Sequence, residues 1–139
     1  MEANFPDSPI WFNEGLASLY EQPFEKDGRI QGATNWRLNP LQLAIRAGSA
    51  PSFDALMNSG RGEFHGKHEA IYYAEARYLL FYLQERGLLR EYFRAFVANV
   101  AQDPSGLGTL TSVLHEPDVH AFRLQWEAFV LGLTFVPRR

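Results

Sequence analysis

Residues 68–86 read HEAIYYAEARYLLFYLQER, the longest stretch of the chain with an unbroken helical pattern. Its apolar side chains recur at steps of three and four residues, the period of an amphipathic helix: Ile71, Tyr72, Ala76, Leu79, Leu80 and Leu83. Gly87 follows at once and is a typical helix terminator. The run 79–83 is wholly apolar, so we expect it to lie in the core. A helix of this length and pattern predicts a helical domain built around it.

Proline, glycine and capping residues divide the rest of the chain into helix-sized pieces. We expect further helices over residues 8–22, 41–47, 52–58, 88–100, 105–114 and 118–133. The pair Asp27-Gly28 lies between two short semi-apolar runs and predicts a β-hairpin or a tight loop within residues 25–36. Three glycines favour a loop over residues 59–67. The predicted fold class is therefore mostly all-α, with one small hairpin.

Composition limits both the domain count and the function. A length of 139 residues fits one domain, and a hydrophobic fraction of 46% with 14% aromatic residues excludes a disordered chain. The net charge of −3 and the lack of a Lys/Arg run argue against nucleic acid as a partner. No apolar run reaches the ~18 residues of a membrane-spanning helix. The absence of cysteine excludes disulfides and thiolate chemistry.

Residues 9–21, PIWFNEGLASLYE, carry the most informative pattern. At about 100° per residue, Glu14, Ser18 and Glu21 fall within roughly 60° of one another on a helix. Gly15 lies in the middle of this helix, where glycine costs ~1 kcal/mol relative to alanine. A glycine at such a position usually lets another backbone come close. Composition alone favours a surface helix whose acidic side chains face water.

The order Trp11-x-Asn13-Glu14-Gly15-x-Ala17 resembles the signature of the gluzincin zinc metallopeptidases. These hydrolases bind zinc through the two His of a His-Glu-x-x-His helix and a Glu of a second helix. The resemblance implies that Glu14 is the third zinc ligand and that the substrate is a peptide or a protein. Two His and one Glu are a common ligand set of catalytic zinc and leave one position for water.

The resemblance also implies supporting residues around the metal. In such enzymes an acid one or two turns beyond the ligand Glu often accepts a hydrogen bond from a ligand His and fixes its tautomer. Here that role would fall to Glu21, or less directly to Ser18.

A second resemblance lies in the central helix. In aminopeptidase-type gluzincins a Tyr begins a long helix at a comparable distance after the ligand Glu, and a stripe rich in Leu, Phe and Tyr follows it. Tyr73 lies 59 residues after Glu14 and leads into LLFYLQERG at 79–87. The resemblance implies that Tyr73 donates a hydrogen bond to the oxyanion. Tyr72 is the alternative, and a packing role would suit either ring. The likeness extends to the Trp126 helix and so covers nearly the whole chain.

The chain departs from the family because it has no His-Glu-x-x-His. Its four histidines are His65, His68, His115 and His120. Five residues separate the last two, which turns their rings about 140° apart on a helix, and Pro117 would break that helix. We expect these histidines to be solvated or capping residues.

We therefore expect a fragment of a longer zinc metallopeptidase, whose two-His helix would precede Met1. Zinc would be the cofactor of the intact parent, whereas the chain alone would bind it poorly and be inactive. The alternative is a non-catalytic helical domain that binds a partner.

The helix over residues 8–22 also predicts association. It carries more apolar side chains than one core-facing stripe requires: Ile10, Trp11, Phe12, Leu16, Leu19 and Tyr20. Apolar patches beyond a few hundred Å² usually mark an interface. We therefore expect a two-fold homodimer through this helix. The alternative is that Phe5 and the N-terminal arm fold back over it.

Overall fold

The computed structural model describes residues 7–21, 23–26, 29–60, 64, 66 and 68–135. Its helices are α1 (Ile10–Leu19), α2 (Leu38–Ala47), α3 (Phe53–Met57), α5 (Glu69–Glu85), α6 (Leu89–Asn99), α7 (Leu107–Leu114) and α8 (Val119–Leu131). The prediction of a mostly α-helical fold is confirmed.

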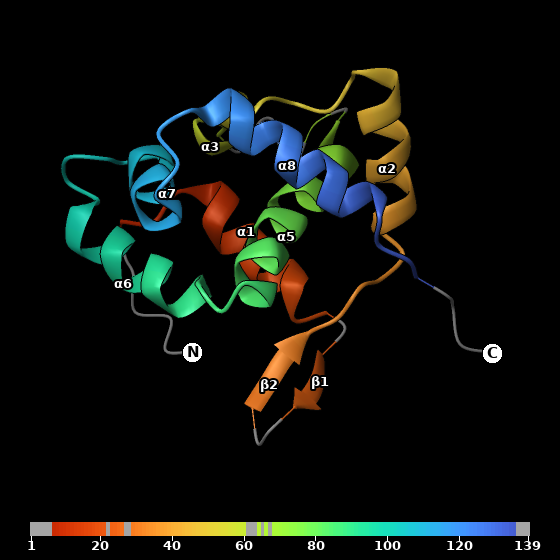
Figure 1. The fold of residues 1–139 in the computed structure, drawn as a ribbon, viewed down its shortest axis with the longest axis horizontal. Helices are drawn as coiled ribbons and strands as arrows, with labels where there is room; N and C mark the ends of the chain where they lie inside the picture. Colours follow the sequence, from red (N-terminus) through yellow and green to blue (C-terminus); the bar gives the residue numbers. More distant parts are fainter. Residues whose placement is uncertain are drawn as a thin grey trace.

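Helix α5 lies at the centre of the fold and contacts α1, α2, α3, α6 and α8. Helix α8 crosses one side of this centre, with α2 at one end of the molecule and α6 and α7 at the other (Figure 1). Strands β1 (Pro23–Lys26) and β2 (Arg29–Gly32) pair antiparallel as a hairpin that projects from the helices (Figure 1). The hairpin therefore forms near the predicted position, although Asp27 and Gly28 lie outside the described residues.

Local signals in the sequence fix most helix ends. The side chains of Ser52 and Asp118 accept hydrogen bonds from first-turn backbone N–H groups of α3 and α8. Gly48 and Gly87 follow α2 and α5 in the left-handed conformation, each with φ of 71°. Helix α1 ends at Leu19, before the predicted end at 22, because the chain enters strand β1 at Pro23. Most of the predicted loop 59–67 lies outside the described residues.

Aromatic side chains form most of the core, in two clusters on either side of α5. One cluster joins α1 to α6: Trp11, Phe12, Tyr92 and Phe96. The other joins α3, α5 and α8: Phe53, Tyr82, Phe122 and Trp126. The predicted core run 79–83 is buried throughout. Val97 on α6 is 41% exposed, because the buried face of α6 is narrow and is formed by Leu89, Tyr92 and Phe96.

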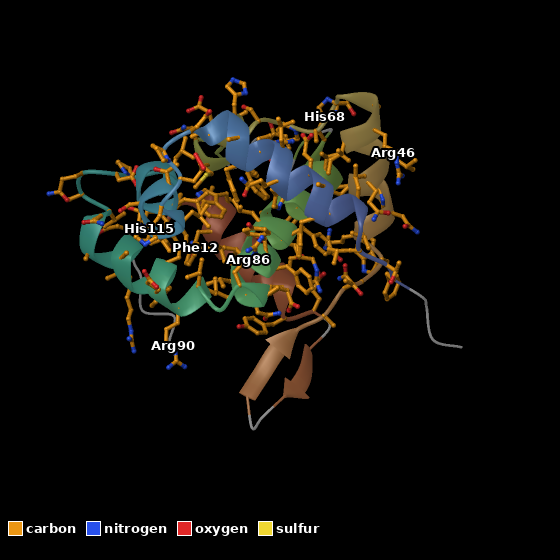
Figure 2. All side chains as sticks on the ribbon, viewed as in Figure 1. Phe12, Arg46, His68, Arg86, Arg90 and His115 are labelled. Atoms are coloured by element: carbon orange, nitrogen blue, oxygen red, sulfur yellow. The ribbon has the colours of Figure 1, made fainter. Side chains whose placement is uncertain are left out.

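The argument for a dimer through the first helix is wrong in its premise. Trp11, Phe12 and Leu19 are fully buried within the chain itself. The Trp11 indole N–H donates to the backbone oxygen of Ser105 at 2.8 Å, and Phe12 stacks on Phe93 with ring centroids 5.9 Å apart. Figure 2 shows Phe12 directed into the molecule, while Arg46 and Arg90 extend outward. The chain's own α5 and α6 cover most of the surface that a partner was expected to bury, and a dimer remains untested.

The contact between α1 and α5 is close at Gly15. A Cβ atom built at Gly15 would lie 3.1 Å from the Ala76 backbone oxygen and 2.9 Å from the Leu80 side chain. The sequence-based expectation that Gly15 admits another backbone is therefore confirmed. This contact sets how near the polar side chains of the two helices come to each other.

Replacing Gly15 with valine should separate the two helices. We expect Gly15→Val to lower the free energy of unfolding by about 2 kcal/mol, because overpacking a tight contact typically costs 1–3 kcal/mol. Ala17→Val is the matched control, since Ala17 is exposed on the same helix. Urea denaturation of both variants measures the difference. Equal losses at positions 15 and 17 would show that the contact is not tight.

Candidate functional site

Glu14 on α1 and Tyr73 on α5 meet where the two helices pack. The Tyr73 hydroxyl lies near the half-buried Glu14 carboxylate. Partial burial raises the pKa of the Tyr73 phenol, and the neighbouring Glu14 and Glu69 carboxylates raise it further. Arg37 acts in the opposite direction. The predicted metal ligand and the predicted hydrogen-bond donor are thus neighbours.

The structure separates the two candidate tyrosines by what their hydroxyls approach, not by how their rings pack. Both rings meet buried Phe64 edge-on, with centroids 5.7 Å away for Tyr72 and 5.2 Å away for Tyr73. The hydroxyl that reaches Glu14 belongs to Tyr73. Of the two alternatives, Tyr73 is therefore the one positioned to act together with Glu14.

Glu21 forms a two-point ion pair with Arg37. Its carboxylate oxygens accept from Arg37 Nε at 2.9 Å and from Nη2 at 3.0 Å. The side chain of Asn35 donates to the same carboxylate at 3.2 Å and that of Ser18 at 3.4 Å. The hydrogen bond from Arg37 is the main cause that lowers the pKa of Glu21. Glu21 is thus engaged with Arg37, and it could orient an imidazole only by giving up part of that pair.

Ser18 lies one turn after Glu14 and is only 2% exposed. Ser18 therefore does not face water, although it shares one side of the helix with Glu14 and Glu21. Its hydroxyl points along α1 toward Glu21 rather than out of the fold.

Arg77 lies beneath this cluster on α5 and is completely buried. Its Nη2 donates to the backbone oxygen of Ala33, and its Nη1 lies 3.9 Å from the Glu21 carboxylate. Burial lowers the pKa of Arg77. Its Nε and Nη1 have no hydrogen-bond partner. Two guanidinium groups, those of Arg37 and Arg77, therefore share the single carboxylate of Glu21.

The segment 32–35 is fastened to α5 by side-chain hydrogen bonds. The Gln84 amide accepts from Gly32 N–H at 2.9 Å and donates to the Gly32 oxygen at 2.8 Å. The Asn35 N–H donates to the Tyr78 hydroxyl at 3.0 Å. These contacts fix the position of the chain that carries Arg37.

Sequence reasoning missed Asn35, Arg37 and Arg77 as members of this cluster. The available signal was Arg77, a charged residue between the apolar positions of the central helix. Nothing in the spacing of Asn35 and Arg37 indicates that they return to α1, because the hairpin determines where they lie.

The described histidines lie apart from this cluster. His68, His115 and His120 are exposed, as expected, and His65 lies outside the described residues. Figure 2 shows His68 and His115 on opposite sides of the molecule. Among the residues that the structure describes, no three His, Cys, Asp or Glu side chains are grouped so as to hold a metal ion. Within the same residues, no helix is long and apolar enough to cross a membrane.

Comparisons with protein-family models, curated proteins and solved structures find no match to this chain. The likeness to gluzincins therefore rests on the motif residues of the sequence alone.

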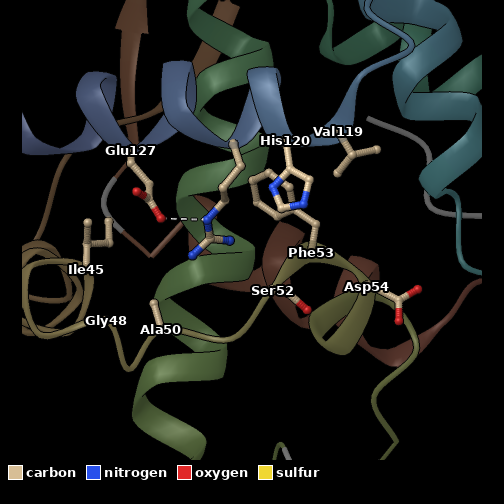
Figure 3. A pocket seen from close by; sticks show the side chains of 10 residues that line it. Ile45, Gly48, Ala50, Ser52, Phe53, Asp54, Val119, His120 and Glu127 are labelled. Carbon is tan, nitrogen blue, oxygen red and sulfur yellow. Dashed lines mark hydrogen bonds and ion pairs between the residues drawn. The ribbon is translucent and has the colours of Figure 1, made fainter.

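A cavity of about 390 Å³ lies away from Glu14 and Tyr73, between α2, α3 and α8 (Figure 3). Its lining includes Ile45, Phe53, Val119 and Arg123. Arg123 Nε donates to Glu127 at 2.7 Å, the ion pair drawn in Figure 3. His120 lines this cavity, whereas Glu14, Ser18, Glu21 and Tyr73 do not.

Glu75 on α5 is the buried partner of Arg123. It is completely buried and accepts from Arg123 Nη1 at 3.0 Å, while its other oxygen has no hydrogen-bond partner. Burial raises the pKa of Glu75 to about 7, and the neighbouring Arg123 only partly offsets this. The folded chain therefore holds a carboxyl that titrates near neutral pH.

We expect Glu14→Gln to lower the pKa of Tyr73, because the substitution removes one of the charges that raise it. Titration of tyrosines labelled with ¹³C at Cζ measures the pKa, and the Tyr73→Phe spectrum identifies the signal. Glu91→Gln, a change on exposed α6, is the control. An unchanged pKa for Tyr73 in Glu14→Gln would show that the two side chains do not interact.

The raised pKa of Glu75 predicts that the free energy of unfolding falls as the pH rises. Its folded pKa lies above the ordinary value of 4.5, so the folded chain retains this proton longer than the unfolded chain. Between pH 5 and 8 we expect the free energy of unfolding to decrease by about 2 kcal/mol from this group. Glu75→Gln should remove that decrease, whereas Glu85→Gln, at an exposed position of α5, should keep it. Parallel pH profiles for the wild type and Glu75→Gln would contradict the assignment.

Proposed function

We propose that this chain carries the Glu and Tyr part of a gluzincin-type zinc site, within a hydrolase that cleaves peptide bonds. Glu14 is the zinc ligand and Tyr73 is the catalytic hydrogen-bond donor. The two imidazoles come from a segment outside this sequence, so the chain alone is inactive.

The observation that carries this proposal is the closeness of Tyr73 and Glu14, which lie near enough for the carboxylate to raise the pKa of the phenol. Their positions are 59 residues apart, and the sequence named them separately, each from its own motif. If Glu14 were only a surface acid and Tyr73 only a packing residue, nothing would require the two side chains to lie close together. A metal ligand and a donor to the oxyanion must lie close together, because the substrate carbonyl lies between metal and donor.

The donor set fits zinc in part. Glu14 supplies one carboxylate, whereas catalytic zinc commonly takes three protein ligands. When bound, zinc would act as a Lewis acid on the peptide carbonyl and would activate a water molecule. The residues of this chain hold the metal through Glu14 and present a phenol beside it.

Tyr73 can act as a donor because its phenol keeps its proton at neutral pH, as an ordinary tyrosine does. Burial and the neighbouring carboxylates raise its pKa further above 10.0. It can then donate to the negative charge that develops on the substrate oxygen. Glu21, whose side chain is 38% exposed, remains more accessible to a ligand imidazole than the buried Ser18, although Arg37 already binds it.

The test uses the open reading frame upstream of Met1. We expect an in-frame His-Glu-x-x-His there, and a protein that includes it should bind zinc and cleave peptides. Glu14→Gln should abolish zinc binding and activity in this longer protein. Tyr73→Phe should keep the zinc and lower kcat by about 10²–10³-fold, as for loss of one oxyanion donor. Tyr72→Phe is the matched control and should leave kcat unchanged.

The 139-residue chain itself should show no zinc site tighter than micromolar in a titration, because one carboxylate supplies one of three ligands. A nanomolar site in this chain would contradict the proposal, as would the absence of an upstream His-Glu-x-x-His. If the chain is instead a non-catalytic binding domain, the longer protein will cleave no peptide.

A further inference from the structure

The cavity between α2, α3 and α8 offers a continuous apolar surface. Ile45, Ala50, Phe53 and Val119 all line it. Figure 3 shows Ile45 at one end and Val119 at the other, with Ala50 and Phe53 between them in this view. Its volume of about 390 Å³ lies in the size range of small-molecule sites, which are mostly apolar and carry a few polar groups. The cavity therefore suits the apolar body of a small molecule.

Arg123 has hydrogen-bonding capacity to spare at this cavity. A guanidinium has five N–H donors. Its Nε donates to Glu127 at 2.7 Å, and its Nη1 donates to the Pro51 oxygen and to Glu75, both at 3.0 Å. Nη2 donates to no acceptor in the part of the chain that the structure describes, and 15% of the side chain is exposed. Both N–H bonds of Nη2 thus remain for a ligand.

Two aromatic rings hold the guanidinium of Arg123 in place. Its central carbon lies 4.7 Å from the centre of the Phe53 ring and 4.8 Å from that of the Trp126 ring. Together with the three hydrogen bonds, these contacts keep the guanidinium in one orientation. A donor that is fixed in advance loses less conformational freedom on binding than a free side chain does.

The charge of Arg123 is already balanced by its own neighbours. Glu127 and the buried Glu75 both accept hydrogen bonds from it. A ligand carboxylate at Arg123 would therefore lie next to two other carboxylates, and a ligand ammonium would lie next to the guanidinium. Asp54 adds a further negative charge to the lining. A neutral acceptor avoids both repulsions, because a carbonyl oxygen can accept from Nη2 without adding a charge.

We propose that this cavity binds a small neutral molecule that has an apolar body and a carbonyl group, such as a ketone, an ester or an amide. The apolar body packs against Ile45 and Phe53, and the carbonyl oxygen accepts a hydrogen bond from Arg123 Nη2. Glu14 and Tyr73 do not line the cavity. Binding here is therefore independent of the proposed zinc site.

The test uses the 139-residue chain and prodan, a neutral aminonaphthalene with a ketone whose fluorescence responds to the polarity around it. We expect saturable binding of one molecule per chain, with a Kd of about 0.1 mM or below. An analogue with a methylene group in place of the carbonyl gives the reference affinity without the hydrogen bond. An analogue with a carboxylate in place of the ketone should bind more weakly than prodan.

Two variants assign the contacts. Arg123→Lys keeps the charge but lacks Nη2, so the affinity ratio of prodan to the methylene analogue should fall about tenfold, as for loss of one hydrogen bond to a charged group. Arg90→Lys, at an exposed position of α6, is the matched control and should keep the ratio. Ala50→Phe fills the cavity and should weaken the binding of both probes at least about tenfold. Ala17→Phe, at an exposed position of α1, should leave both unchanged.

An absence of saturable prodan binding would overturn the proposal, as would undiminished binding by Ala50→Phe. An unchanged ratio in Arg123→Lys would show that the carbonyl does not meet Nη2. If that variant does not fold, NMR of the wild-type guanidinium decides: prodan should shift the signals of Arg123 and the methylene analogue should not, and equal shifts would overturn the proposal. Tighter binding of the carboxylate than of prodan would refute a neutral ligand.

Discussion

The close packing of Gly15 on Ala76 determines how near the polar and charged side chains of α1 and α5 lie to one another. Because glycine has no side chain, α1 can approach the backbone of α5. Glu14, next to that glycine, then comes within hydrogen-bonding reach of Tyr73. Further along α1, Glu21 comes near Arg77. A larger residue at position 15 would separate both pairs at once.

One of the charged side chains between these helices, Arg77, is shielded from solvent. Arg77 is wholly buried and two of its nitrogens lack partners, although an unmet buried donor ordinarily costs about 1–3 kcal/mol. Fully satisfied polar networks rigidify a structure, whereas partly satisfied ones are costly. The hydrogen bonds from α5 to Gly32 and Asn35 help to offset this cost by fixing the connection between the hairpin and α2.

The helices could be predicted from sequence because their signals are local. Ser52 and Asp118 cap their helices, and Gly48 and Gly87 end theirs, through contacts within a few residues.

The site could be predicted only in part. The motifs around Glu14 and Tyr73 identified those two residues. Arg37 lies near them because the hairpin returns the chain toward α1, and no local sequence pattern predicts that path. The full burial of Trp11 and Phe12 could not be predicted from the helical pattern, because that pattern gives α1 a single buried face, whereas α5 and α6 both pack against it.

The claim that Glu14 and Tyr73 form one site can be tested most directly by a double-mutant cycle on stability. The free energy of unfolding is measured for the wild type, Glu14→Gln, Tyr73→Phe and the double variant. We predict that the two losses are not additive and that the coupling energy is about 0.5–1.5 kcal/mol, the range of an ordinary intramolecular hydrogen bond. Losses that add to within about 0.3 kcal/mol would show that the two side chains do not interact, and would contradict the account.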